Sequence, residues 1–377
     1  MMNENHAKKI VLCLNLGSTS SEVAYQGADG VVQRRKIRHK DSDLALPIKE
    51  QQSFRTAAIM NWLESISMDL AALDAVSCRG GRLKPIPSGV YLVNDELLAD
   101  SASTTLGDHA SRLSVFIGRD LALHAGCPVY VVDPISVDEF DDVARVTGVK
   151  GVERHSLGHI LNSRFVAKKL AVDLDLDPLI STFIVAHMGG GATISLHKNS
   201  RIIDLINDFE GALTPERAGG LATTTFLQLL DHEPRQRVER LIEGDGGFYD
   251  YFATKQFDVV DQMAREGDDQ ARLLIDAYLY QQKKSIGSLL AAVNLNVDGL
   301  ALTGGISFSE TVVNGLSECF SSLFPVRVYA GSFEVEALIS GAEDALSGQC
   351  AVLHYPSGSV LPTAFAIETI GDEGVAE

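Results

Sequence analysis

Short apolar runs alternate along the chain with stretches of helical periodicity. Four of these runs end abruptly at glycine or a polar residue, as buried strands do, over residues 10–14, 129–132, 183–186 and 300–302. The spacing between them predicts helices over about residues 108–125, 138–147, 156–172, 269–292 and 334–346. Asp138 and Ser156 stand where the second and third of these helices would have their N-caps. Strands that alternate with helices predict an α/β protein.

Two segments repeat one plan of a strand, a glycine-rich loop and a second apolar run. The first segment covers residues 10–25 and the second covers residues 183–196. In each, the strand ends on a polar side chain, which is Asn15 in the first and His187 in the second. The repetition predicts a duplicated fold with one phosphate-binding hairpin in each half and a nucleotide cleft between two domains. Two ordinary hairpins with glycine turns are the alternative.

Length and charge narrow the class of protein. The chain has 377 residues, which at roughly 150 residues per domain favours two or three domains. Its 50 acidic and 32 basic side chains give a net charge of −18, which repels nucleic acid and anionic membranes, so we expect neither as a partner. Five scattered cysteines without Cys-x-x-Cys spacing indicate reduced thiols. No apolar run reaches the ~18 residues of a membrane helix, and we expect a cytoplasmic protein.

Both glycine-rich loops carry groups that bind phosphate. Gly17, Ser18 and Ser20 offer backbone N–H groups and hydroxyls, which are the donors that cradle a phosphate. Residues 189–191 are three consecutive glycines after a buried strand, and such a run is entropically costly unless the backbone must approach something closely. A flexible hairpin is the alternative reading of the second loop.

Motifs in a fixed order over residues 8–347 carry a resemblance to a known family. They are the segments 15–20, 79–81, 85–91, 109–111, 131–134, 137–139, 142–146, 187–191, 214–217 and 302–306. With these motifs the sequence resembles the acetate and butyrate kinase (acetokinase) family, most closely its butyrate kinase branch. The resemblance implies an α/β fold of duplicated actin-like ATPase (ribonuclease H-like) domains with an interdomain cleft. It places an N-terminal domain over residues 1–150 with a C-terminal return over 340–377, and a nucleotide-binding domain over 151–339.

The resemblance also implies an activity. Members of the family transfer a phosphoryl group from ATP to a short-chain fatty acid such as butyrate and form an acyl phosphate, with Mg²⁺, and they are commonly dimeric or larger. The chemistry agrees with the residues present, because a carboxylate with a pKa near ~4 is already ionised at neutral pH and needs no general base. What such a site needs is cationic groups, backbone donors and a divalent metal to bring two anions together.

Matched motifs assign candidate roles to individual residues. Arg79 would bind the carboxylate, while Arg217 and His159 would stabilise the phosphoryl group in flight. Asp133 would be a positioning or magnesium-linked carboxylate. The remaining candidates are His109 for substrate binding, Glu334 with Asp133 for the metal, and, for phosphate and nucleotide, Asn15, Gly17, Ser18, Ser20, His187, Gly189, Gly190, Gly191, Gly304, Gly305 and Ile306. Surface arginines, a turn-capping aspartate and helix-packing histidines are the structural alternatives.

The sequence departs from the family on the nucleotide side. Glu22 stands where the family has lysine, and the segment between residues 204 and 214 is about three residues shorter. Gln256 and Asp258 lie in the stretch where the family usually has an Asp and an Arg. The family's Asn-Glu-Glu triplet reads Phe-Glu-Val here, so Phe333 stands in place of the Asn. These changes suggest a weakened or altered-donor paralogue that binds a nucleotide or acyl phosphate without efficient ATP turnover. An alcohol or sugar kinase with Asp133 as the base is a further alternative.

Overall fold

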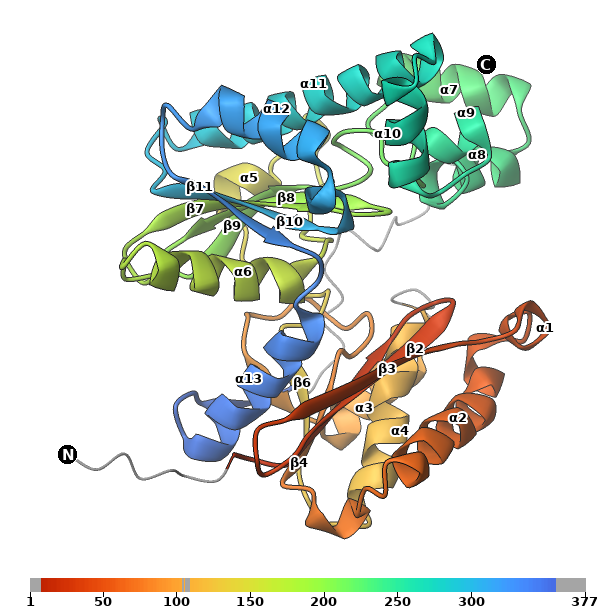
Figure 1. The fold of residues 1–377 in the computed structure, drawn as a ribbon, viewed down its shortest axis with the longest axis vertical. Coiled ribbons are helices and arrows are strands. Elements are labelled where there is room, and N and C mark those ends of the chain that lie inside the picture. Colours follow the sequence, from red (N-terminus) through yellow and green to blue (C-terminus); the bar gives the residue numbers. More distant parts are fainter. Residues whose placement is uncertain (1–7, 104, 106–108, 357–377) are drawn as a thin grey trace, which may run out of the picture. The chain divides into compact units, whose positions relative to one another are not determined.

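The computed structural model describes residues 8–103, 105 and 109–356, which form two compact units (Figure 1). The first unit comprises the chain up to Asp138, then Arg145–His155 and the chain from Glu334 onward. The second comprises Glu139–Ala144 and Ser156–Phe333. Within the return predicted over residues 340–377, the part from 357 onward lies outside the described residues.

A seven-stranded sheet forms the centre of the first unit, in the order β12-β5-β6-β4-β1-β2-β3. Its strands are β1 (Val11–Leu16), β2 (Ser20–Gln26), β3 (Val32–Arg38), β4 (Ala75–Cys78), β5 (Val90–Leu92), β6 (Val129–Val132) and β12 (Val352–His354). Its helices are α1 (Asp41–Leu44), α2 (Gln52–Ser65), α3 (Asp95–Ala102), α4 (Leu113–Ala122) and α13 (Glu334–Ser347).

Helices cover both faces of this sheet. The hydroxyl of Ser77 in β4 donates to the carbonyl of Leu338 in α13, while the thiol of the next residue, Cys78, contacts the carbonyl of Ser114 in α4. Because neighbouring residues of a strand point to opposite faces, α13 and α4 lie on opposite sides of the sheet, as Figure 1 shows. A strand enclosed in this way is largely apolar, which explains the unbroken apolar run at residues 11–14 of β1.

The second unit has a five-stranded sheet in the order β11-β10-β7-β8-β9. Its strands are β7 (Thr182–Met188), β8 (Ala192–Lys198), β9 (Arg201–Ile206), β10 (Gly299–Gly304) and β11 (Val326–Ala330). Its helices are α6 (Ile160–Asp173), α7 (Thr223–His232), α8 (Arg235–Glu243), α9 (Phe248–Phe252), α10 (Phe257–Arg265), α11 (Asp269–Ala292) and α12 (Glu310–Phe320). Phe183 and Val185 pack with α6, while Ile184 and Met188 pack in the larger core with α11, so this sheet is also covered on both faces.

The two sheets share one topology. In the first, β1 is antiparallel to β2 and parallel to β4, β2 is antiparallel to β3, and β4 is parallel to β6. In the second, β7, β8, β9, β10 and β11 repeat these pairings in the same order. The duplicated α/β fold predicted from the repeated hairpins is therefore confirmed.

Three helix predictions were wrong in detail. The helix expected over 108–125 is the shorter α4, which a 3₁₀ turn at Ala110–Arg112 precedes; residue 108 lies outside the described residues. The helix expected over 138–147 is a single turn, α5 (Asp142–Arg145), because the Asp138 carboxylate pairs with Arg145 at 2.8 Å and contacts His155 at 3.1 Å. The helix expected from Ser156 begins at Ile160, with His159 at its N-cap position. In the described residues, no helix has the length and apolar character needed to cross a membrane.

Candidate active site

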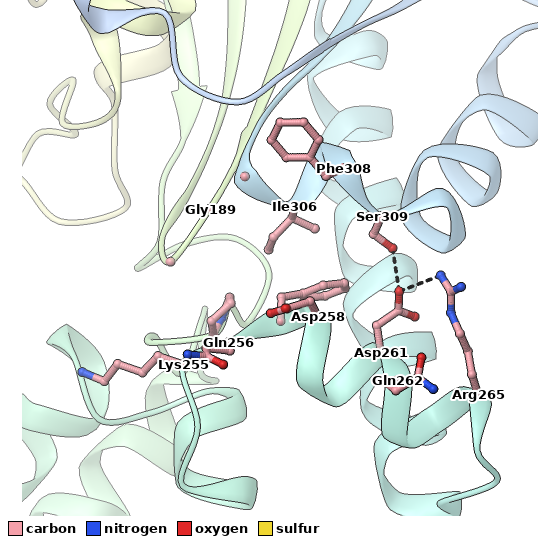
Figure 2. A pocket seen from close by; sticks show the side chains of 14 residues that line it. Gly189, Lys255, Gln256, Asp258, Asp261, Gln262, Arg265, Ile306, Phe308 and Ser309 are labelled. Atoms are coloured by element: carbon pink, nitrogen blue, oxygen red, sulfur yellow. Dashed lines mark hydrogen bonds and ion pairs between the residues drawn. The ribbon is translucent and has the colours of Figure 1, made fainter. Parts of the chain in front are cut away.

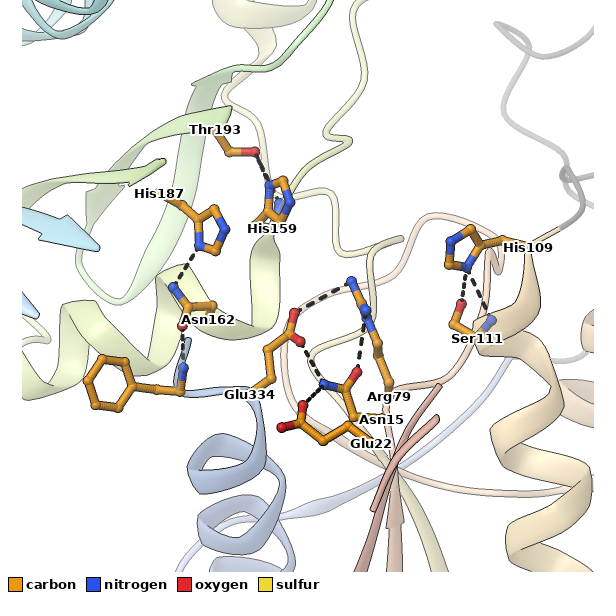
Figure 3. A network of polar contacts seen from close by, with 11 residues as sticks. Asn15, Glu22, Arg79, His109, Ser111, His159, Asn162, His187, Thr193 and Glu334 are labelled. Atoms are coloured by element: carbon orange, nitrogen blue, oxygen red, sulfur yellow. Dashed lines mark hydrogen bonds and ion pairs between the residues drawn. The ribbon is translucent and has the colours of Figure 1, made fainter. Parts of the chain in front are cut away.

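Four polar side chains of the first unit meet at the end of β1; we call them the Asn15 cluster (Figure 3). Asn15 lies opposite Glu22 in the β1–β2 pair, Arg79 directly follows β4, and Glu334 is the first residue of α13. The Nδ2 of Asn15 donates to Glu22 Oε2 at 2.9 Å and to Glu334 Oε2 at 2.7 Å. Arg79 donates to Asn15 Oδ1 at 3.3 Å and pairs with Glu334 Oε1 at 3.5 Å.

The donor set of the Asn15 cluster fits Mg²⁺. Glu22 and Glu334 supply carboxylate oxygens that both lie against the amide nitrogen of Asn15, so they are close to each other, while the amide oxygen of Asn15 faces Arg79. Mg²⁺ is commonly held by one or two carboxylates together with water and substrate phosphate. Among the described residues, no group of three or more His, Cys, Asp and Glu side chains is arranged as a protein-only metal site. Magnesium bound here would therefore depend on phosphate and water for its remaining ligands.

A buried arginine holds the first glycine-rich loop. Arg55 of α2 is fully buried and donates to the carbonyls of Gly17 at 3.1 Å and Ser18 at 3.0 Å, with a longer contact of 3.4 Å to the carbonyl of Ser20. Desolvation by burial lowers the pKa of this guanidinium, and Gln51 Oε1 accepts two further bonds from it. The predicted phosphate loop is thus fixed through its carbonyl oxygens.

Asp133 and His109 are both bound to nearby backbone of the first unit. Asp133 follows β6 with φ of 37°, a left-handed conformation that aspartate tolerates better than most residues. Its Oδ1 accepts from the N–H of Gly89 at 2.8 Å, and its own N–H donates to the Gly89 carbonyl at 3.0 Å. His109 caps a short 3₁₀ turn, since its Nδ1 accepts from the N–H of Ser111 at 3.1 Å.

The two predicted histidines of the second unit lie together. The rings of His159 and His187 stack with centroids 4.1 Å apart and planes 9° from parallel. The Nδ1 of His159 lies 2.9 Å from the hydroxyl of Thr193, and Thr193 is also the residue opposite His187 in the β7–β8 pair. The hairpin that carries the glycines therefore also brings the two imidazoles together.

Carboxylates, rather than open space, lie against the three-glycine loop. A Cβ atom at Gly191 would lie 2.6 Å from Asp208 Oδ2, and one at Gly190 would lie 2.7 Å from Glu216 Oε1. The backbone N–H of Ala192 donates to Asp208 Oδ1. The glycines predicted that some group comes close to the loop backbone. The carboxylates of Asp208 and Glu216, from the chain itself, do so at Gly191 and Gly190.

Arg217 is attached to the same loop. The hydroxyl of Thr214 donates to the Gly190 carbonyl at 2.7 Å and accepts from the Arg217 N–H at 3.1 Å, while the Arg217 guanidinium lies 3.4 Å from Glu216. Desolvation raises the pKa of Asp208 to about 6, against the lowering effects of the Ala192 hydrogen bond and Arg217. The predicted motifs 187–191 and 214–217 thus form one structure.

A cavity of about 600 Å³ opens beside these glycines (Figure 2). The cavity is lined by Gly189, Gly190, Gly305, Ile306 and Phe308, and by residues 255–258, the segment whose sequence departs from the family pattern. The volume lies in the range of small-molecule sites. Its cations already have partners within the chain, because Arg265 pairs with Asp261 at 3.0 Å and Lys255 lies over the Tyr249 ring. Phe308 is 73% exposed and presents a ring at the cavity edge.

Comparisons with known proteins assign the family. Residues 145–323 match the model of the acetokinase family. Over 356 residues the chain is 36% identical to a probable butyrate kinase of Enterococcus faecalis, covering 93% of this chain and 98% of that protein. It is 37% identical over 345 residues to butyrate kinase 2 of Clostridium acetobutylicum, covering 90% and 97%. The chain belongs to the acetokinase family. The acetate kinase structure from Porphyromonas gingivalis superposes with a TM-score of 0.72 at 18% identity, covering 90% of this chain and 100% of that one, which confirms the actin-like fold.

The predicted site residues of this acetokinase-family chain are divided between the units. The first unit holds Asn15, Gly17, Ser18, Ser20, Arg79, His109, Asp133 and Glu334. The second holds His159, His187, Gly189, Gly190, Gly191, Arg217, Gly304, Gly305 and Ile306. Their individual roles stay predictions. Sequence reasoning missed Arg55, Asp208 and Asn162, whose positions beside the motifs depend on long-range contacts that no local pattern signals.

Proposed function

We propose that this protein is a phosphotransferase that moves a phosphoryl group from ATP to the carboxyl group of a short-chain fatty acid such as butyrate, forming an acyl phosphate. The observation that carries the proposal is the identity of 36–37% with relatives named butyrate kinases, over nearly the full length of both chains. No finding favours the weakened or altered-donor paralogue.

The residues of the chain supply what this chemistry needs. The guanidinium of Arg79 lies at the Asn15 cluster with one edge on Glu334, and it would bind the substrate carboxylate through a charge-assisted pair. Arg217, held by the Thr214 turn, would neutralise charge on the phosphoryl group. The carboxylate is already ionised, so no residue has to remove a proton from the nucleophile.

The cavity of the second unit would bind the nucleotide. Its glycine-lined side, at Gly189, Gly190 and Gly305, lets backbone approach the phosphates, while Ile306 and Phe308 offer apolar surface to the base. Glu334, with Asn15 and Glu22 beside it, would hold Mg²⁺. That ion, when bound, supplies charge neutralisation on the phosphates. We also propose a cytoplasmic protein that forms homodimers or larger oligomers.

A hydroxamate-trapping assay tests the proposal. Acetate, propionate, butyrate and isobutyrate are each combined with ATP, GTP and pyrophosphate in the presence of Mg²⁺. We expect acyl hydroxamate with ATP and at least one of the acids. Arg79→Gln should lower kcat/KM by about 100-fold or more, while Arg82→Gln, an exposed arginine three positions along, should leave it within about twofold.

If no acyl hydroxamate forms with any pair of substrates, the proposal that the protein is a carboxylate kinase is rejected. Calorimetric titration with MgATP then separates the alternatives, because clear nucleotide binding without turnover would select the non-catalytic paralogue.

A further inference from the structure

Asn162 connects three parts of the second unit that carry predicted site residues. It lies in α6 and is fully buried. Its Oδ1 accepts the backbone N–H of Phe333 at 2.8 Å, and its Nδ2 lies 2.9 Å from His187 Nδ1 and 3.4 Å from the Thr303 hydroxyl. Figure 3 shows the amide between the His187 ring and the backbone of Phe333.

The direction of the contact with His187 is forced. A backbone N–H can only donate, so the amide oxygen of Asn162 must face Phe333 and the NH₂ group must face the imidazole. Since an amide NH₂ can only donate, the Nδ1 of His187 must be the acceptor and carries no proton. A neutral imidazole has a single N–H, and that proton therefore lies on Nε2.

We propose that Asn162 is a positioning residue that keeps His187 in the neutral Nε2–H form, so that Nε2 donates a hydrogen bond to the phosphate group of the substrate and does not accept a proton. The inference rests on the proposed function for the identity of the substrate. A fixed donor suits this chemistry, because an ionised carboxylate releases no proton when it attacks phosphorus and a preorganised donor stabilises the charge of the phosphoryl group.

The stacked partner supports the neutral form of His187. His159 lies parallel to it with ring centroids 4.1 Å apart, and two imidazolium cations at that separation repel each other strongly. The stack thus disfavours protonation of both rings, and Asn162 disfavours it at His187 in particular, since the Nδ1 of an imidazolium would have to donate toward an NH₂ group.

Asn162→Asp is the informative substitution, because it keeps size and the acceptor for Phe333 but replaces the donor to His187 by an acceptor. His187 would then carry its proton on Nδ1, and Nε2 would lose its donor role. Thr303→Val is the matched control, since it removes the longer contact of the same amide, together with the hydroxyl's bond to the Gly331 carbonyl at 3.1 Å, and leaves the contact between Asn162 and His187 in place.

The measurement is a long-range ¹H–¹⁵N correlation spectrum of protein labelled at the imidazole nitrogens of its ten histidines, without substrate, with His187 assigned by the loss of its signals in His187→Gln. We expect Nε2–H in the wild type and in Thr303→Val, and Nδ1–H in Asn162→Asp. Protonated Nδ1 in the wild type would overturn the proposal, and this test does not depend on folding of any Asn162 variant.

Kinetics separate a positioning role from a merely structural one. We expect Asn162→Asp to lower kcat by about 100-fold while the KM for the carboxylate stays within about threefold, because a donor to the phosphoryl group is lost. An altered tautomer with unchanged kcat would refute the role in catalysis. If the spectrum shows the expected tautomer but the protein phosphorylates no carboxylate, the proposed function is rejected. The role of Nε2 toward the substrate is then rejected too, while the assignment of the proton to Nε2 stands.

Discussion

Arg55 offers a sharp test of how the first glycine-rich loop is held. The change is Arg55→Lys, which keeps the positive charge but replaces a planar fork of five donors by a single ammonium. The wild-type guanidinium reaches the Gly17 carbonyl at 3.1 Å, the Ser18 carbonyl at 3.0 Å and the Ser21 hydroxyl at 3.1 Å, through two different nitrogens. One ammonium nitrogen cannot occupy both nitrogen positions.

The magnitude follows from the bonds that are lost. Hydrogen bonds to a charged group contribute about 1.5–3 kcal/mol each, and we expect lysine to lose two of them, so the free energy of unfolding should fall by about 3–6 kcal/mol. Because the site is fully buried, water cannot replace the lost donors. The loop that loosens is the predicted phosphate loop, so the KM for MgATP should also rise by about tenfold.

Urea unfolding monitored by circular dichroism, together with steady-state kinetics, measures both effects. Arg119→Lys on α4 is the matched control, since Arg119 is exposed, and it should change the unfolding free energy by less than about 0.5 kcal/mol. A loss below about 1 kcal/mol in Arg55→Lys, with an unchanged KM, would refute the view that Arg55 holds the loop.

Three further predictions concern single positions. Asp208 binds its proton more tightly in the folded protein than in the unfolded chain, because its pKa is raised to about 6. The wild type should therefore lose about 1–2 kcal/mol of stability relative to Asp208→Asn as the pH rises from 3.8 to about 6. Urea unfolding of both proteins at each pH would measure this loss, and a constant difference would contradict the raised pKa. Glu22→Lys should raise the KM for MgATP by about tenfold, because it removes a carboxylate from the proposed magnesium site and puts a cation there; a lower KM would show that Glu22 repels the nucleotide phosphates instead. Phe308→Ala should raise the KM for ATP by about tenfold with kcat within about twofold, whereas an unchanged KM would place the base elsewhere.

Regular elements were predictable where the chain's own pattern decides the structure. The helix expected over 269–292 is α11 with the same bounds, because its periodicity is long and Asp268 caps it by accepting from the N–H of Ala271 at 2.9 Å. The strand expected over 129–132 is β6, a run enclosed on both faces. In contrast, Asp138 looked like a helix cap but is paired with Arg145, seven residues along, and contacts His155, and neither pairing follows from the apolar periodicity of the segment.

The site was predictable as motifs but not as a network. Matched motifs led to Asn15, Arg79 and Glu334, and the structure brings these three together. The residues that hold the motifs, Arg55 and Asn162, are single polar positions inside helices, where a sequence reading favours a solvent-exposed face. Only the folded chain shows that both are fully buried and bonded to the site loops.

The reverse reaction tests the central claim most directly. Purified protein is mixed with butyryl phosphate, ADP and Mg²⁺, and ATP formation is followed by luciferase luminescence, with Arg79→Gln as the inactive reference. A carboxylate kinase must form ATP from these substrates, and the Arg79 variant should form it about 100-fold more slowly or worse. Absence of ATP with butyryl, propionyl and acetyl phosphate alike, in protein that remains folded, would contradict the assignment.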